Sequence, residues 1–331
     1  MAKPTAARAA DDHATLPLAD VVAAYGRQFL LLPVAATSAP SWDDALLPAV
    51  VRARRGDCVV GDRVAYRLVA ERQAVVEAVQ PRRNVVTRSD QWRSKTIAAN
   101  VDQAAVIVSG QPLFDEALLL RVLIALASER IPALLIATKD DLPDARRAFA
   151  VRAPVYAALG YEVLATAAKT DPGSLAPLQH RLAGRRTVLL GQSGMGKSTL
   201  VNALVPGASQ QTAALSEALA SGRHTTTFTR AFALPVIDAG GGSGRDDGRD
   251  DEPIRQRGWI IDSPGFQSFE VAQLSRWQAA HAMPEFVPLL GDCRFNDCRH
   301  HDEPGCAIRA AADAGRIDAT RYRLFTELLL D

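Results

Sequence analysis

The stretch Gly191-Gln192-Ser193-Gly194-Met195-Gly196-Lys197-Ser198 decides the fold of the chain around it. It has the form G-x-x-x-x-G-K-S, which is typical of a loop that cradles phosphates between a strand and a helix. The apolar run at 186–190 precedes it as a buried strand, and an apolar-periodic helix is predicted to begin at Lys197. A simple glycine-rich turn is the alternative, but both flanking elements favour a nucleotide site.

Each residue type in this loop suits phosphate binding. Gly191, Gly194 and Gly196 allow the backbone to turn its N–H groups inward, and the helix that follows adds the positive end of its dipole. Lys197 is predicted to reach the outer phosphates, and the Ser198 hydroxyl to bind Mg²⁺. The predicted binding segment runs from Gly191 to Thr199.

Composition narrows the class of protein. The chain has 331 residues and a formal net charge of +1, so its overall charge points to no nucleic-acid partner. No apolar run is long enough for a membrane span, and the Ala-rich residues 1–20 have no secretory core and are predicted to form a disordered tail. We expect a cytoplasmic monomer that has no contact with membranes.

Residues 21–97 are rich in short strand patterns broken by glycines, which predicts a small OB-fold barrel. Expected strands include Arg27–Leu32, Asp57–Val60 and Gln73–Val79. Basic residues exceed acidic ones here, which fits either an RNA-binding face or an arginine-rich solvated surface. The basic residues are Arg52, Arg54, Arg55, Arg63, Arg67, Arg72, Arg82, Arg83, Arg88, Arg93 and Lys95.

Residues 98–284 alternate between strands and helices, which predicts a parallel α/β sheet that includes the P-loop strand. One helix is expected to run through Tyr156. The strand at 133–137 ends in Thr138-Lys139-Asp140-Asp141, which resembles the [NT]-K-x-D motif that reads guanine. Asp141 could accept two N–H bonds from guanine, which adenine cannot supply, while the Lys139 stem covers the base. Ala168 and Lys169 resemble a backbone loop that supports guanine.

Two further motifs follow the P-loop. The segment Gly222–Thr227 is predicted to be a loop in which Thr226 or its neighbour Thr225 binds Mg²⁺, although an exposed polar turn would look the same. The apolar strand at 258–261 then ends in Asp262-Ser263-Pro264-Gly265, a D-x-x-G pattern. Asp262 would hold Mg²⁺ through water, and the Gly265 N–H would sense the γ-phosphate. Between them, the low-complexity residues 239–252 predict a disordered extension.

Residues 285–331 contain Cys293, Cys298, His300 and Cys306, three thiols and an imidazole within fourteen residues. This set predicts one closed, structural Zn²⁺ site, followed by one or two helices. The fourth cysteine, Cys58, is interpreted as a core residue in a barrel strand.

The order of the motifs is informative, because the guanine pair precedes the P-loop and the D-x-x-G pattern. Such an order indicates a circularly permuted GTPase domain, which an α/β fold tolerates when its ends lie close together. With the barrel, the segment 93–103 and the cysteine cluster, the chain resembles the ribosome small-subunit-dependent GTPase A family, RsgA or YjeQ.

The resemblance implies a GTPase that binds the 30S subunit and its 16S rRNA late in maturation and that the ribosome stimulates. The expected cofactors are GTP/GDP, Mg²⁺ and Zn²⁺. A GTP-gated RNA-binding module without hydrolysis and a permuted GTPase of large-subunit assembly are the alternatives. Phe266 stands where many GTPases have a water-orienting Gln, so free hydrolysis should be slow. His224 is a candidate to orient the attacking water, or else a surface histidine.

Overall fold

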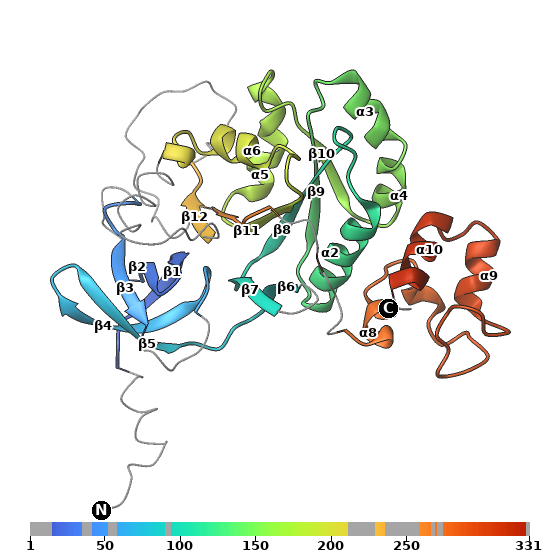
Figure 1. Ribbon diagram of the computed structural model, residues 1–331, viewed down its shortest axis with the longest axis horizontal. Helices are drawn as coiled ribbons and strands as arrows, with labels where there is room; N and C mark the ends of the chain where they lie inside the picture. The colour runs from blue at the N-terminus through green and yellow to red at the C-terminus, as the bar shows by residue number, and fades with distance from the viewer. Residues whose placement is uncertain are drawn as a thin grey trace, which may run out of the picture.

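The computed structural model describes residues 15–34, 42–51, 58–89, 94–210, 229–235, 258–265, 269 and 274–328. The first fourteen residues and the segment 239–252, both predicted to be disordered, lie outside this part. Within it, strands of the barrel and of the α/β domain join in one 11-stranded sheet, and a helical C-terminal module packs at the other side of the α/β domain (Figure 1). No helix among the described residues is long and apolar enough to cross a membrane.

Five parallel strands form the α/β part of the sheet, in the order β10-β9-β8-β11-β13. β8 is buried along its whole length, which is usual for a strand covered by helices on both faces. The short β12 lies antiparallel to β13. The strands are β8 (Gln103–Ser109), β9 (Ala133–Thr138), β10 (Glu162–Ala165), β11 (Arg186–Gly191), β12 (Thr229–Ala233) and β13 (Trp259–Asp262).

Helices cover both faces of these strands. In Figure 1, α2 (Glu116–Ser128), α3 (Pro143–Ala150) and α4 (Ala153–Ala158) lie on one side, and α5 (Ala176–Leu182) and α6 (Lys197–Leu204) on the other. A short 3₁₀ turn, η1 (Pro172–Leu175), leads into α5. The single helix expected through Tyr156 is wrong: the chain breaks into α3 and α4, because Pro154 in the first turn of α4 has no N–H to continue a preceding helix.

The N-terminal strands form a five-stranded, OB-like barrel in the order β1-β2-β3-β5-β4, which β1 and β4 close. β1 begins at Leu18, inside the predicted tail. The strand predicted at Asp57–Val60 is wrong in its described part, since only Val60 makes a bridge, to Ala98. Cys58 is buried as predicted but lies outside any strand. The barrel strands are β1 (Leu18–Tyr25), β2 (Gln28–Pro33), β3 (Leu47–Val51), β4 (Arg63–Ala70) and β5 (Gln73–Val79).

Two backbone connections among the described residues join the barrel to the α/β domain. The hairpin of β6 (Val85–Ser89) and β7 (Ser94–Ala99) leads the chain into β8. In addition, β1 pairs with β12 at Ala23–Arg230 and Ala24–Thr229. Because β12 also pairs with β13, backbone hydrogen bonds run without a break from the strand that ends in Asp262 to the barrel.

The C-terminal module packs against α2. Leu120 and Ile124 of α2 share an apolar core with Phe286 and Phe325. The module is built from α8 (Arg276–His281), η2 (Val287–Leu289), α9 (Ala307–Asp313) and α10 (Ala319–Leu328).

Polar contacts add to this interface. Arg152, at the start of α4, donates to Glu116 of α2 and, at 2.9 Å, to Asp318 just before α10. One guanidinium therefore bridges α2 and the C-terminal module, and the module is fixed to a helix of the α/β domain rather than suspended from a linker.

Replacing Leu120 by Ala should weaken this interface. The side chain is 1% exposed in the shared core, so the cavity should lower the free energy of unfolding by about 2–5 kcal/mol. Val151→Ala is the control: Val151 is 75% exposed, and its truncation should change stability by less than about 0.5 kcal/mol. Urea unfolding followed by circular dichroism measures both, and equal stability of the two variants would contradict the described packing.

Candidate functional site

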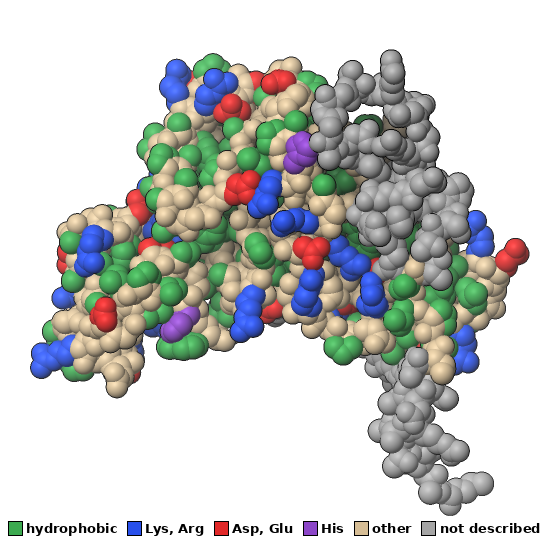
Figure 2. All heavy atoms as spheres, turned by 180° about the vertical axis from the view of Figure 1, so that it is seen from behind, with side chains coloured by type: hydrophobic (Ala, Val, Ile, Leu, Met, Phe, Trp, Pro, Cys, Tyr) green, Lys and Arg blue, Asp and Glu red, His purple; other side chains and the backbone are tan. Residues whose placement is uncertain are grey.

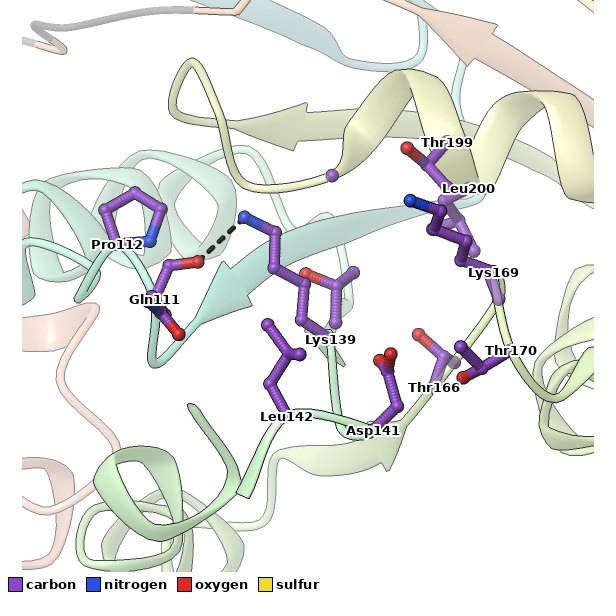
Figure 3. A pocket seen from close by; sticks show the side chains of 13 residues that line it. Gln111, Pro112, Lys139, Asp141, Leu142, Thr166, Lys169, Thr170, Thr199 and Leu200 are labelled. Atoms are coloured by element: carbon purple, nitrogen blue, oxygen red, sulfur yellow. Dashed lines mark hydrogen bonds between the residues drawn. The ribbon is translucent and has the colours of Figure 1, made fainter. Parts of the chain in front are cut away.

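A cavity of about 560 Å³ lies at the carboxyl edge of the parallel strands, where open α/β sheets bind ligands (Figure 3). The guanine-motif residues and the P-loop share it. In Figure 3 the Asp141 carboxylate points into the space that the Lys139 and Lys169 side chains flank. Its lining includes Thr138, Lys139, Asp141, Ala168, Lys169 and Gly196.

Lys139 joins the T-K-x-D loop to the P-loop. Its Nζ donates to the carbonyl oxygens of Gln111, at 2.7 Å, and Gly194, at 2.8 Å. Its φ of 60° lies in the left-handed region, which is uncommon for a residue with a Cβ and is held here by these bonds. The Lys139 stem is thereby fixed along one wall of the cavity, where it could cover a planar base.

Thr138 makes a second connection between the same two loops. Its buried hydroxyl contacts the carbonyl oxygens of Met195 in the P-loop and of Val108, 3.2 Å away in β8. The ends of β8, β9 and the P-loop are therefore held together before any ligand is considered.

The P-loop backbone adopts conformations that its glycines make possible. Gly194 and Gly196 have φ of 82° and 89°, a region that L residues with a Cβ rarely adopt. Gly196 is the N-cap of α6, and the first N–H groups of an α-helix have no acceptor within the helix itself. Met195 is 2% exposed and anchors the loop in the core, whereas Ser198 and Thr199 stay exposed. This arrangement can bind an anion through N–H groups.

The D-x-x-G segment lies directly against the P-loop. The Lys197 ammonium forms an ion pair with the Asp262 carboxylate. The buried Ser263 hydroxyl donates to the Leu189 carbonyl at 2.7 Å. Gly265 approaches the P-loop so closely that a Cβ there would lie 3.4 Å from the Cα of Ser193. Lys197, Ser198 and Asp262 therefore lie where the P-loop meets the D-x-x-G segment.

Four predicted residues lie outside the described part of the chain. His224, Thr225 and Thr226 of the threonine loop belong to the segment 211–228, and Phe266 to 266–268. Their proposed roles in magnesium binding and water orientation stay predictions.

Sequence reasoning missed two contributors. Gln111 and Pro112 line the cavity directly after β8, and their position at the carboxyl edge of a parallel strand could have identified them. Gln192 was assigned to the phosphate loop, but its side-chain oxygen accepts the Asp115 N–H at 3.0 Å, at the N-cap of α2. No local pattern reveals that contact, because the two residues are 77 positions apart.

A second site lies in the C-terminal module. One ligand atom from each of Cys293, Cys298, His300 and Cys306 lies within 4.8 Å of the others. The His300 Nδ1 is 3.5 Å from the Cys293 sulfur and 3.8 Å from the Cys306 sulfur. Ligands of a tetrahedral metal with bonds of about 2.0–2.3 Å would have such separations. The four residues fit a closed metal site, and His301 lies outside it, beside Asp302.

The loop that carries these ligands is fixed by Glu303. Burial alone would raise the pKa of Glu303, but N–H bonds from Arg299 and His301 outweigh it and hold that pKa at about 2. Burial, above all, raises the pKa of the Cys298 thiol to about 12. A cation at the centre of the cluster is the ordinary means of keeping such thiols as thiolates.

Comparisons with known proteins identify the family of the chain. The model of the family described as RsgA GTPase matches residues 79–246. The chain is 44% identical to the small ribosomal subunit biogenesis GTPase RsgA of Paraburkholderia phytofirmans, over 93% of this chain and 91% of that protein. It is 42% identical to the protein of the same name from Burkholderia pseudomallei, over 93% and 90% of the two chains.

Two solved structures share the fold. YjeQ from Thermotoga maritima superposes with a TM-score of 0.68 at 25% identity, over 95% of this chain and 97% of that one. YloQ, described as a circularly permuted GTPase, superposes with a TM-score of 0.66 at 24% identity, over 96% of this chain and 95% of that one.

The cysteine cluster should carry a metal that depends on all four ligands. We expect about one divalent ion for each wild-type chain and a large loss of that ion in Cys306→Ser. Cys58→Ser is the matched control, because Cys58 is also buried but lies outside the cluster. Elemental analysis of the purified variants gives the answer; equal metal content in wild type and Cys306→Ser would show that the cluster is not a metal site.

Proposed function

The chain belongs to the RsgA GTPase family and is a GTPase of small ribosomal subunit biogenesis; on this premise we propose that it hydrolyses GTP to GDP and phosphate at the cavity of β8, β9, β11 and β13. One observation carries the proposal. The T-K-x-D loop, the P-loop and the D-x-x-G segment converge at one edge of the sheet, although they follow the permuted order along the chain.

Guanine would bind at the end of the cavity that Asp141 lines. Its carboxylate can accept the N1–H and the exocyclic N–H of guanine, and adenine offers no such pair of donors. The Lys139 stem would cover one face of the base, and the backbone around Ala168 and Lys169 would support its edge. These residues come from two separate segments that line one cavity, which supports the assignment.

The phosphates would lie on the P-loop, from Gly191 to Thr199. The N–H groups of the loop and of the first turn of α6 would bind their oxygens, and the Lys197 ammonium would move from Asp262 to the β- and γ-phosphates. The Ser198 hydroxyl and the Asp262 carboxylate are oxygen donors that suit Mg²⁺. Bound there, Mg²⁺ would neutralise charge on the β- and γ-phosphate oxygens.

Hydrolysis requires in-line attack of water on the γ-phosphate. Lys197 and the P-loop N–H groups would stabilise the charge of the transition state. Phe266 cannot orient water through a hydrogen bond, so we propose that the ribosome supplies or completes the missing assistance, with His224 as the candidate on this chain.

We also propose the identity of the metal, the RNA partner, and the stage and place of action. The metal of the Cys₃His cluster is Zn²⁺, because thiolate and imidazole ligands in a closed set of four are those of structural zinc sites. The chain acts late in maturation, as a cytoplasmic monomer, and contacts 16S rRNA through the barrel and the C-terminal module. These points rest on membership of the family.

Turnover of GTP should depend on the small subunit. We expect purified small ribosomal subunits to raise GTP hydrolysis by roughly tenfold or more, because a partner that completes the catalytic set stabilises the transition state. Large subunits should leave the rate unchanged, and ATP should not be turned over. Phosphate release with small subunits, large subunits or none measures this; no stimulation, or stimulation by large subunits alone, would refute the proposed role.

Asp141→Asn should abolish the preference for guanine. Loss of a hydrogen bond to a charged acceptor is worth about 1.5–3 kcal/mol, so GDP affinity should fall about 10- to 150-fold. Asp140→Asn is the control, because the Asp140 carboxylate pairs with Arg146 at 3.3 Å and is not part of the cavity lining. Calorimetric titration with GDP and ADP compares the variants. If Asp141→Asn bound GDP as tightly as Asp140→Asn, Asp141 would not read the base.

A further inference from the structure

Arg146 of α3 contacts the backbone of the T-K-x-D loop beside Asp141. Its Nε donates to the Asp140 carbonyl oxygen at 2.8 Å, and its Nη2 donates to the same oxygen. The Asp140 carbonyl and the Asp141 N–H belong to one planar peptide group. The arginine therefore fixes the orientation of the peptide that leads into Asp141, although it does not itself line the cavity that the described residues enclose.

Two backbone bonds hold the rest of this loop. The Leu142 N–H donates to the Lys139 carbonyl at 3.0 Å, which closes a turn around the two aspartates. The Asp140 N–H donates at 3.1 Å to the carbonyl of Thr166, the residue directly after β10. The peptide group before Asp140 is thus held by the neighbouring strand end, and the arginine holds the peptide group after it.

The contact with the carbonyl matters more than the ion pair between the same two residues. The Arg146 Nε lies 3.3 Å from the Asp140 carboxylate, and the two side chains are 59% and 33% exposed. Such a pair contributes little, because water screens it. A rigid guanidinium that directs two N–H groups at one carbonyl oxygen fixes a direction in space. Asp140→Asn would therefore keep the contact that orients the loop.

The next residue along the helix, Arg147, has a different partner. Its guanidinium pairs with Asp144, three positions earlier in α3, and its side chain is 76% exposed. In Figure 2, Lys and Arg side chains lie beside Asp and Glu side chains at the upper left, the end of the molecule where α3 lies in Figure 1. Charge on this surface does not distinguish the two arginines, whereas their contacts do.

We propose that Arg146 is a positioning residue for base specificity, and that it orients the Asp141 carboxylate through the Asp140 peptide. This role rests on the proposed function, in which Asp141 accepts the N1–H and the exocyclic N–H of guanine. Figure 3 shows the Asp141 carboxylate pointing into the cavity. Both of its oxygens must face the two donors, because hydrogen bonds weaken steeply as their angle departs from linear. Without the guanidinium, that direction would be less well defined.

The test compares GDP with inosine diphosphate, which lacks the exocyclic amine of guanine but carries the same phosphates. The ratio of their dissociation constants isolates the contact with the amine, and calorimetric titration of the full chain measures both. Wild type should bind GDP about tenfold or more tightly than inosine diphosphate. Arg146→Ala should lower this preference about two- to tenfold, because the carboxylate loses its fixed direction. Arg146→Lys keeps one donor and should lie between the two.

Arg147→Ala is the matched control and should bind both nucleotides as wild type does, because its ion pair stays within α3. Alanine favours helix, and both side chains are exposed, so neither truncation should unfold α3. Arg146 has no role in specificity if Arg146→Ala keeps the wild-type ratio, even with both affinities reduced, since a structural role alone would give that result. If wild type itself binds the two nucleotides equally, Asp141 does not read the amine, and the base reading in the proposed function fails together with this inference.

Discussion

The structure depends on one constraint, that direct hydrogen bonds hold the T-K-x-D loop and the P-loop together. Thr138 contacts the Met195 carbonyl, and the Lys139 ammonium contacts the carbonyl of Gly194. Both residues lie at or just after the end of β9, two strands away from β11 in the sheet. The distance between the T-K-x-D loop and the P-loop is therefore set by hydrogen bonds within the protein. A nucleotide meets a site that is already assembled, and this limits the ordering that binding requires.

The permuted order connects the nucleotide site to both flanking modules, the barrel and the C-terminal module. The strand β12 follows the segment of the threonine loop and pairs with β1, so it belongs to the α/β domain and to the barrel at once. The D-x-x-G segment precedes α8, which packs with the C-terminal module against α2. Gln192 connects the P-loop to the N-cap of the same helix. Both flanking modules thus contact elements that adjoin the P-loop or the D-x-x-G segment, the arrangement that a switch would need.

Local patterns sufficed for the parts of the fold that local chemistry determines. The P-loop, the parallel strands and the spacing of Cys293, Cys298, His300 and Cys306 could be read from short stretches. What the sequence did not reveal depends on distant partners. Asp20 in β1 can be buried because it pairs with Arg63 and Arg186, which lie 43 and 166 residues away in the sequence. Arg152 and Asp318, which form another ion pair, are also 166 residues apart. Several basic residues of the barrel are likewise paired, Arg67 with Glu77 and Arg82 with Asp62, so composition overstated its cationic surface.

A GTPase switch of this kind should bind the small ribosomal subunit with an affinity that depends on the bound nucleotide. The most direct measurement is its affinity for purified small subunits, by cosedimentation, with a non-hydrolysable GTP analogue and with GDP. A coupling free energy of about 1–3 kcal/mol between the two binding events is usual, so we expect the protein to bind the subunit about 5- to 150-fold more tightly with the analogue than with GDP. Equal affinity in the two states would contradict the account, because the γ-phosphate would then have no effect on the barrel or the C-terminal module.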